Sequence, residues 1–210
     1  MTSPAHSVKA ARRPVSRRRD ALILAGLGLL LSVLSALPVR EHSLDPVERD
    51  VFRAVNTHTV APFLIVWVIM QLGNIVVVPV AAIVAAVARR WWLSAGLFIG
   101  GVAVYVLAKV VKGAVVRGRP ASLIPDVRIR GAEPLGRGYP SGHAAVVTLI
   151  VVLAWPYLRR RGRIVAVTLA TVVCLARMYV GAHLPLDIIG GMALGLLVGG
   201  ALRFVGTPAR

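Results

Sequence analysis

The chain has 210 residues, of which 57% are hydrophobic, and its mean hydropathy is +0.77. This composition excludes an ordinary soluble globular protein and indicates an integral membrane protein. The formal net charge is +17. Because the basic residues are interleaved with long apolar runs, the charge does not indicate a nucleic-acid partner.

The first twenty residues are polar, rich in arginine and contain two prolines. We expect residues 1–20 to form a disordered basic cytoplasmic tail. The arginines before the first apolar run also resemble a signal peptide or twin-arginine signal. An uncleaved anchor is preferred, because five further spans follow and the arginine pattern requires an even number. Residues 21–205 are expected to form one membrane domain.

Apolar segments along the chain predict an all-α protein, an integral membrane bundle of six helices. Three charge-free runs approach or exceed the roughly 20 residues that cross a bilayer: 21–39, 61–88 and 91–108. Three shorter runs reach that length only when extended past an ionisable residue at one end: 144–158, 164–176 and 188–202. In the second run, Gln71 and Asn74 are expected to pack inside the bundle, and Pro79 to kink the helix.

Arginine clusters at residues 12–19, 89–90 and 159–163 fall in alternate connections between these spans. By the positive-inside rule that side is cytoplasmic, which gives an N-in/C-in topology. Seven of the eight acidic residues fall on the other side, Asp20 being the exception. We therefore expect a multi-pass protein of the plasma membrane.

The first outer loop predicts a short helix after the first span, with Asp45 as its N-cap and Pro46 at its first position. Apolar residues fall on one stripe, opposite a polar face: Val47, Val51, Phe52 and Val55 against Glu48, Arg49 and Arg53. The pattern is typical of a helix in the membrane interface, and it also fits a solvated connecting helix.

The third span becomes basic towards its outer end. Lys112 and Arg119 are seven residues apart, which on a helix places them on one face. Pro120 forces Arg119 out of helical geometry, so its guanidinium can reach across the mouth of the bundle. The neighbouring basic residues are expected to extend to lipid headgroups: Lys109, Arg117, Arg128 and Arg130.

Two further segments carry polar groups to the same end. In residues 137–143 a glycine-rich turn leads into the fourth span, and Ser141 suits the N-cap of a helix whose first N–H groups attract anions. Alone, this segment fits an ordinary capped helix equally well. Further on, Pro185 suits the first position of the sixth helix, so Asp187 in its first turn can reach back to His183.

Together these segments predict a receptor for a phosphoryl dianion, because Lys112, Arg119 and Arg177 are three cations beside a helix N-terminus. The two histidines, His143 and His183, suggest covalent catalysis with help from a general acid. They lack the paired spacing of a metal site, so no metal and no other cofactor are expected.

These residues carry a resemblance. Lys112-x6-Arg119-Pro120, then Pro140-Ser141-Gly142-His143, then Arg177-x5-His183-x3-Asp187 resemble the three-part signature of the type 2 phosphatidic acid phosphatase superfamily, which shares its helical core with vanadium haloperoxidases. The resemblance implies a metal-independent phosphatase in which His183 is phosphorylated, Asp187 orients it and His143 is the general acid. It also implies a set of residues that hold the phosphate: Lys112, Arg119, Ser141, Gly142 and Arg177.

One position departs from the family pattern, since Ala176 stands where a serine usually precedes the arginine of the third part. A hydroxyl donor worth on the order of 1–2 kcal/mol is then missing if it contacts the transition state.

The expected activity is hydrolysis of a lipid phosphomonoester or diphosphate that reaches an outward-facing site from the bilayer. Candidate substrates are a polyprenyl diphosphate, phosphatidic acid and phosphatidylglycerol phosphate. Two alternatives stay open, a phosphotransferase that uses a lipid or sugar hydroxyl as acceptor and a catalytically weak lipid-phosphate binder. Vanadate-dependent oxidation is disfavoured, because the enzymes that perform it are typically soluble.

Overall fold

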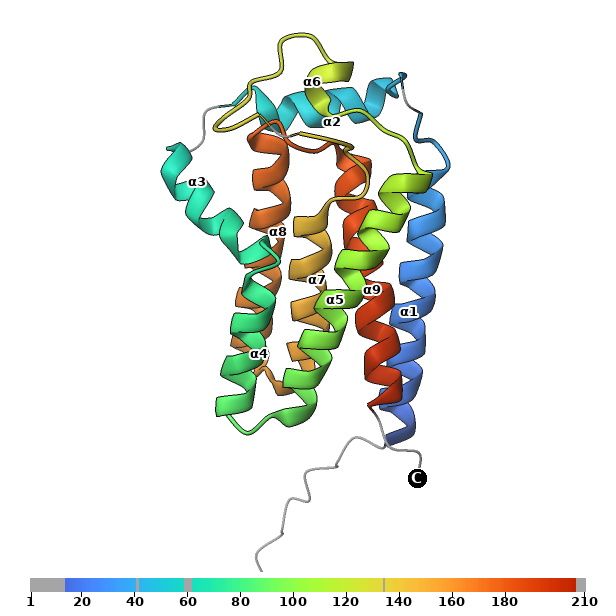
Figure 1. Cartoon of the computed structure of the whole chain (residues 1–210), viewed down its shortest axis with the longest axis vertical. Helices are drawn as coiled ribbons and strands as arrows, with labels where there is room; N and C mark the ends of the chain where they lie inside the picture. The colour runs from blue at the N-terminus through green and yellow to red at the C-terminus, as the bar shows by residue number, and fades with distance from the viewer. Residues whose placement is uncertain (1–13, 41, 59–61, 134, 207–210) are drawn as a thin grey trace, which may run out of the picture.

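The computed structural model describes residues 14–40, 42–58, 62–133 and 135–206, which form helices joined by turns and loops without any strand (Figure 1). The α-helices are α1 (Pro14–Ala36), α2 (Pro46–Asn56), α3 (Phe63–Met70), α4 (Val77–Val87), α5 (Trp91–Ala114), α6 (Pro120–Leu123), α7 (Gly142–Ala154), α8 (Arg160–Tyr179) and α9 (Pro185–Val205). Two short 3-10 segments are η1 (Gln71–Gly73) and η2 (Trp155–Tyr157). The all-α prediction is confirmed.

Four of these helices, α1, α5, α8 and α9, are long and apolar enough to cross a membrane. The pair α3 and α4, bent by 63°, is a fifth candidate, and the apolar helix 142–157 is shorter than the others. Each of the six expected spans thus has a helical counterpart, and the number that cross the bilayer remains a prediction.

The expected N-terminal tail is partly helical, because α1 begins at Pro14 and so includes residues 14–20. Residues 1–13 of that tail lie outside the described residues. The helix therefore begins before the expected boundary at residue 20.

The core lies between α5, α7 and α9. Leu97, Val104, Leu149, Leu194 and Val198 from these helices are buried together. The first helix packs along α9, and most of its large apolar side chains face outward, as lipid-facing residues do. This packing fixes the position of α9, whose first turn contributes to the site described below.

The break between α3 and α4 precedes the proline that was expected to kink this span. Pro79 lies in the first turn of α4, where its missing N–H leaves no hydrogen bond unmade. The helix stops instead at Asn74, whose backbone is extended and whose side-chain oxygen accepts a bond from Val76 N–H at 3.1 Å. A Cβ at Gly73 would lie only 2.9 Å from the Cβ of His143, so the break brings this segment against α7.

The helix predicted in the first outer loop is confirmed as α2, and Asp45 caps it by accepting a bond from Val47 N–H at 2.9 Å. Its buried face differs from the prediction. The residues that pack inward are Glu48, Phe52 and Asn56, while Val47 and Val51 are 70% and 46% exposed. The face is polar because α2 lies across the end of the bundle, where loops offer polar partners (Figure 1). Its place in a membrane interface remains a prediction.

Acidic residues of α2, of the loop after α6 and of the first turn of α9 lie at one end of the bundle. α2, α6 and the loop that follows α6 lie at one end, while the α4–α5 connection and the end of α9 lie at the other (Figure 1). Arg89 and Arg90 belong to that opposite end, as do the arginines that begin α8. The arrangement supports the N-in/C-in topology, which remains a prediction.

Candidate active site

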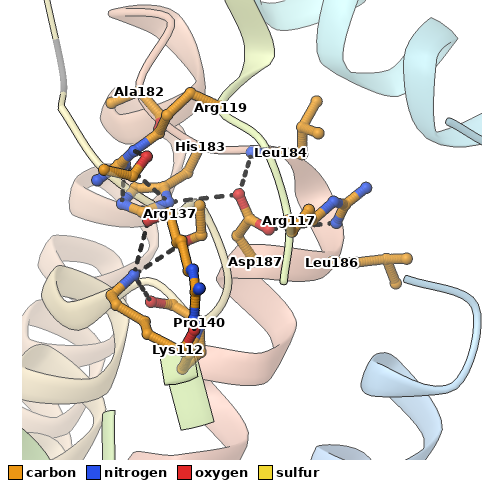
Figure 2. A network of polar contacts seen from close by, with 12 residues as sticks. Lys112, Arg117, Arg119, Arg137, Pro140, Ala182, His183, Leu184, Leu186 and Asp187 are labelled. Atoms are coloured by element: carbon orange, nitrogen blue, oxygen red, sulfur yellow. Dashed lines mark hydrogen bonds and ion pairs between the residues drawn. The ribbon is translucent and has the colours of Figure 1, made fainter. Parts of the chain in front are cut away.

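Three segments far apart in the sequence meet at the end of the bundle that α2 covers (Figure 2). They are the end of α5 with the chain that follows it, the loop leading into α7, and the connection between α8 and α9. All eight residues predicted for the site lie on these segments or on the adjoining turns of α7, α8 and α9: Lys112, Arg119, Ser141, Gly142, His143, Arg177, His183 and Asp187.

Lys112 lies in the last turn of α5 and joins that helix to the loop before α7. Its ammonium group donates to three backbone carbonyls, those of Arg137 at 3.0 Å, Gly138 at 3.2 Å and Pro140 at 2.8 Å. These bonds place a positive charge directly beside Ser141 and hold the loop that presents it.

Arg119 leaves helical geometry before Pro120 and its guanidinium reaches across to the turn between α8 and α9, as predicted, but its relation to Lys112 differs from the prediction. α5 ends at Ala114 and Arg119 is in an extended conformation, so it does not share a helix face with Lys112. Its Nη1 donates to the Ala182 carbonyl at 2.7 Å and lies 3.1 Å from Nε2 of His183. Burial lowers the pKa of Arg119, and the nearby Asp187 carboxylate opposes that shift.

His183 and Asp187 are brought together by the turn between α8 and α9. Gly181 has a φ of +78°, a conformation that glycine adopts without steric strain, and Pro185 starts α9 as predicted. The Oδ2 atom of Asp187 accepts a bond from Leu184 N–H at 2.9 Å and lies 3.4 Å from Nδ1 of His183. The predicted reach of Asp187 back across the first turn is therefore confirmed.

The surroundings keep the His183 ring neutral. Its pKa lies well below the ordinary value, first because the side chain is buried and then because several neighbours repel a positive charge: Arg177, Arg119, Lys112 and His143. A neutral imidazole has a lone pair on one nitrogen. Since Nδ1 faces a carboxylate, that nitrogen keeps the proton and the lone pair lies on Nε2. This lone pair faces Nη1 of Arg119 at 3.1 Å, and it can act as a nucleophile once the guanidinium turns to a phosphoryl oxygen.

Ser141 and Arg177 each hold a buried polar atom without a hydrogen-bond partner among the described residues: the Oγ atom of Ser141 and the Nε atom of Arg177. Ser141 occupies the N-cap position of α7 as predicted, but its side chain makes no capping bond. A buried donor without a partner is uncommon in proteins, and an anionic oxygen at this place would satisfy both groups. Gly142 and His143 form the first turn of α7, where N–H groups lack intrahelical partners.

Arg117 was expected to extend to lipid headgroups, and this prediction was wrong. The side chain is 1% exposed and lies between two carboxylates, those of Glu48 and Asp187. Residue spacing does not reveal this trio, because Glu48 and Asp187 are 139 positions apart. The sequence signal for this trio is Glu48, an acidic residue in the first outer loop.

Arg128 and Arg130 also differ from the expectation, because each donates to a backbone carbonyl near the ends of α2 and α8. The third member of that group, Lys109, lies over the Tyr105 ring at 4.5 Å and is exposed. Ala176 is 5% exposed and packs with Val66 and Met70 of α3. Among the described residues, no three His, Cys, Asp or Glu side chains gather in a way that would hold a metal ion.

Known proteins resemble this chain in sequence and in fold. Residues 89–207 match the PAP2 superfamily. The chain is 29% identical to an undecaprenyl-diphosphatase of Sulfolobus acidocaldarius, covering 82% of this chain and 84% of that protein. It is 31% identical to a decaprenylphosphoryl-5-phosphoribose phosphatase of Mycobacterium tuberculosis, covering 64% and 72% respectively. The fold is similar to the crystal structure of Aquifex aeolicus LpxE, with a TM-score of 0.70 and 23% identity, over 78% of this chain and 98% of that one.

Proposed function

This chain belongs to the PAP2 superfamily and is a phosphatase, and we propose that it hydrolyses lipid phosphates or diphosphates through a phosphorylated His183. The observation that carries the proposal is the pairing of a neutral, buried His183 with Asp187 amid the charges of Lys112, Arg119 and Arg177. Such a group of cations binds a phosphoryl dianion, and a supported imidazole can attack it.

In the first step, Nε2 of His183 attacks phosphorus and the bond to the lipid oxygen breaks. His143, which takes up a proton when the phosphoryl dianion lies beside it, gives that proton to the lipid oxygen, so the lipid leaves as a neutral alcohol, or as a monophosphate where the substrate is a diphosphate. The imidazole becomes a cationic phosphohistidine, which the Asp187 carboxylate stabilises through Nδ1–H. Arg119, Arg177 and Ser141 stabilise the charge on the equatorial phosphoryl oxygens.

In the second step, water attacks phosphorus and the bond to Nε2 breaks. His143, now neutral, accepts the proton of the water, and inorganic phosphate is released with both histidines restored to their starting states. The cations and the N–H groups of α7 supply the positive charge that a metal ion supplies in other phosphatases. We therefore propose a metal-independent reaction.

A lipid substrate is supported by an apolar groove beside the site. The groove has a volume of about 520 Å³ and lies between α1, α5 and α9, where it reaches Tyr139 and Pro140. Pro140 directly precedes Ser141, so a hydrocarbon chain in this groove would have its phosphate end near the cations. Two relatives act on prenyl phosphates by their names, which favours a polyprenyl phosphate or diphosphate over phosphatidic acid or phosphatidylglycerol phosphate.

The site is proposed to face the extracytoplasmic side of the plasma membrane. It lies at the end of the bundle opposite the arginine-rich connections, which the positive-inside rule assigns to the cytoplasm. A cysteine introduced at exposed Ser122 in α6 tests this, after the native Cys174 is replaced by alanine. An impermeant thiol reagent should label it in intact cells, and labelling only after lysis would reverse the topology.

The activity is tested with purified protein on three substrates: a polyprenyl diphosphate, phosphatidic acid and phosphatidylglycerol phosphate. Phosphate release should persist in EDTA, stop with vanadate and vanish in His183→Ala. Loss of activity on chelation would contradict the metal-free mechanism. Release of phosphate only when a hydroxyl acceptor is present would show a phosphotransferase, and retained lipid binding without turnover in the wild type would show a binding protein.

A further inference from the structure

Three charged side chains form a buried line behind His183. Glu48, Arg117 and Asp187 are 6%, 1% and 0% exposed. The Nη1 atom of Arg117 donates to Oδ1 of Asp187 at 3.2 Å, and its Nη2 atom pairs with Oε2 of Glu48. Figure 2 shows Asp187 between His183 on one side and Arg117 on the other. Arg117 thus contacts the orienting carboxylate and not the histidine.

The remaining oxygen of each carboxylate is also occupied. Oδ2 of Asp187 accepts from Leu184 N–H at 2.9 Å and faces the His183 ring, while Oε1 of Glu48 accepts from Leu186 N–H at 2.8 Å. Both carboxylates therefore use one oxygen for the first turn of α9 and the other for the arginine. Figure 2 shows both of these leucines near Arg117 and Asp187.

The geometry gives each member a separate task. A carboxylate rotates easily about its terminal torsion, and the bond from Arg117 to Oδ1 prevents this, so that Oδ2 stays toward the ring. A guanidinium can join two carboxylates because its N–H donors form a rigid planar fork. Glu48 fixes that fork and leaves the trio with one net negative charge. Without it, Arg117 and Asp187 would form a neutral pair.

We propose that Glu48 and Arg117 are positioning residues, which hold Asp187 in the orientation that its contact with His183 requires. The inference rests on the proposed function, in which His183 is the nucleophile. It assigns to α2 a part in the reaction, because Glu48 reaches from that helix to the first turn of α9. Neither residue contacts the substrate, and both act through Asp187.

The test uses Glu48→Gln, which keeps the size of the side chain and one acceptor oxygen, and Arg117→Lys, which keeps the charge but loses the fork. Matched controls are Asp50→Asn and Arg53→Lys, because both residues are exposed on α2. Rates are measured per folded protein, after gel filtration and a Tm measurement. Each test variant should lower kcat at least about tenfold with KM changed less than about twofold. The controls should match the wild type.

The pH profile separates positioning from a merely structural role. Charged or titratable groups face His183 from every side: Lys112, Arg119, His143, Arg177 and Asp187. Glu48 lies behind this set and is joined to it through Arg117. Removing its negative charge leaves the net charge around His183 more positive, so the acid limb of kcat/KM should move to lower pH in Glu48→Gln. Arg117→Lys preserves charge, so its acid limb should stay in place.

Two results would overturn the proposal: a lower Tm or yield with an unchanged kcat per folded protein, or a rise in KM alone. If Glu48→Gln does not fold, Arg117→Lys decides the question by its ratio of kcat to KM effects. Failure of the proposed function looks different, because the wild type would then release no phosphate or His183→Ala would remain active.

Discussion

The carboxylate of Asp187 lies 3.4 Å from Nδ1 of His183 and at the same time caps the turn that carries this histidine. One oxygen thus joins His183, the proposed nucleophile, to the first turn of α9. The carboxylate of a buried Asp beside a catalytic histidine orients the ring and stabilises its cationic form.

Replacing this carboxylate should therefore affect the chemical step. Asp187→Asn keeps the shape but removes the charge, and we expect kcat to fall on the order of 10³–10⁴-fold. The matched control is Asp126→Asn, because Asp126 is exposed and has a positive φ that asparagine also tolerates. Steady-state kinetics of both variants checks the prediction, and a loss below tenfold for Asp187→Asn would contradict the role of Asp187.

The low pKa of His183 predicts a dependence of stability on pH. Below the ordinary histidine pKa, the unfolded chain binds a proton that the buried ring in the folded protein does not accept. Stability should therefore fall as the pH drops below about 6.5, by at most about 1.4 kcal/mol per pH unit from this residue. Above that pH the ring is neutral in both states and contributes no change.

The contribution is measured by comparing the wild type with His183→Gln, which cannot titrate. Between pH 5 and 6.5 the Tm of the wild type should fall more steeply than that of the variant. Above that range the two curves should run parallel. Parallel curves across the whole range would show that the folded protein accepts the proton.

Tyr139 links the loop before Ser141 to α1 through hydrogen bonds of its hydroxyl group. Its hydroxyl lies 2.8 Å from Oγ of Ser35 and donates to the Ser32 carbonyl at 3.2 Å. Tyr139→Phe should lower the unfolding free energy by about 1 kcal/mol. Ser35→Ala removes the same contact from the other side, so a double-mutant cycle on Tm or denaturant midpoints should show coupling. Strictly additive effects would mean that the contact contributes nothing.

Gly191 permits α9 to approach the loop that holds Ser141. A Cβ added there would lie 2.2 Å from the Ser141 carbonyl oxygen, so Gly191→Ala must displace one of the two backbones. A misplacement of about 1 Å can lower a rate by about 10²-fold, and we expect a loss of this order in kcat/KM. The control is Gly26→Ala in α1, where a Cβ would meet nothing within 4 Å. Equal activity of the two variants would contradict this close approach.

The order of helices could be predicted from the sequence because apolar runs, prolines and caps are local signals. Asp45, Pro46 and Pro185 mark helix starts where the structure has them. The break at Asn74 was not predicted, and neither was its consequence, the close approach of Gly73 to His143 in another helix. Similarly, which face of α2 is buried depends on the helix ends and loops against which α2 packs.

The gathering of the candidate site residues at one end of the bundle was also predictable, since their types and spacing carry the family resemblance. Apart from the reach of Asp187 to His183, the contacts that these residues make with one another and with Arg117 were not predictable. Arg117 has the local sequence of a basic residue at a membrane surface, and its burial depends on Glu48 and Asp187, which are distant in the chain. The extended backbone of Arg119 before Pro120 was predicted, whereas the common helix face with Lys112 was not found, because α5 ends at Ala114.

Ala176, which stands where the family usually has serine, gives the last prediction. Its methyl group is buried in an apolar cluster with Val66 and Met70, a setting in which a hydroxyl gains little. In Ala176→Ser the hydroxyl can bond to the carbonyl four residues earlier in α8.

We therefore expect kcat/KM of Ala176→Ser to stay within about threefold of the wild type, and the unfolding free energy to fall by about 1 kcal/mol at most. The comparison uses the same lipid substrate and a Tm measurement. A gain of tenfold or more would show that a hydroxyl at residue 176 reaches the transition state. In that case the packing of α8 around residue 176 changes when the substrate binds, because in this structure the position lies in the apolar cluster.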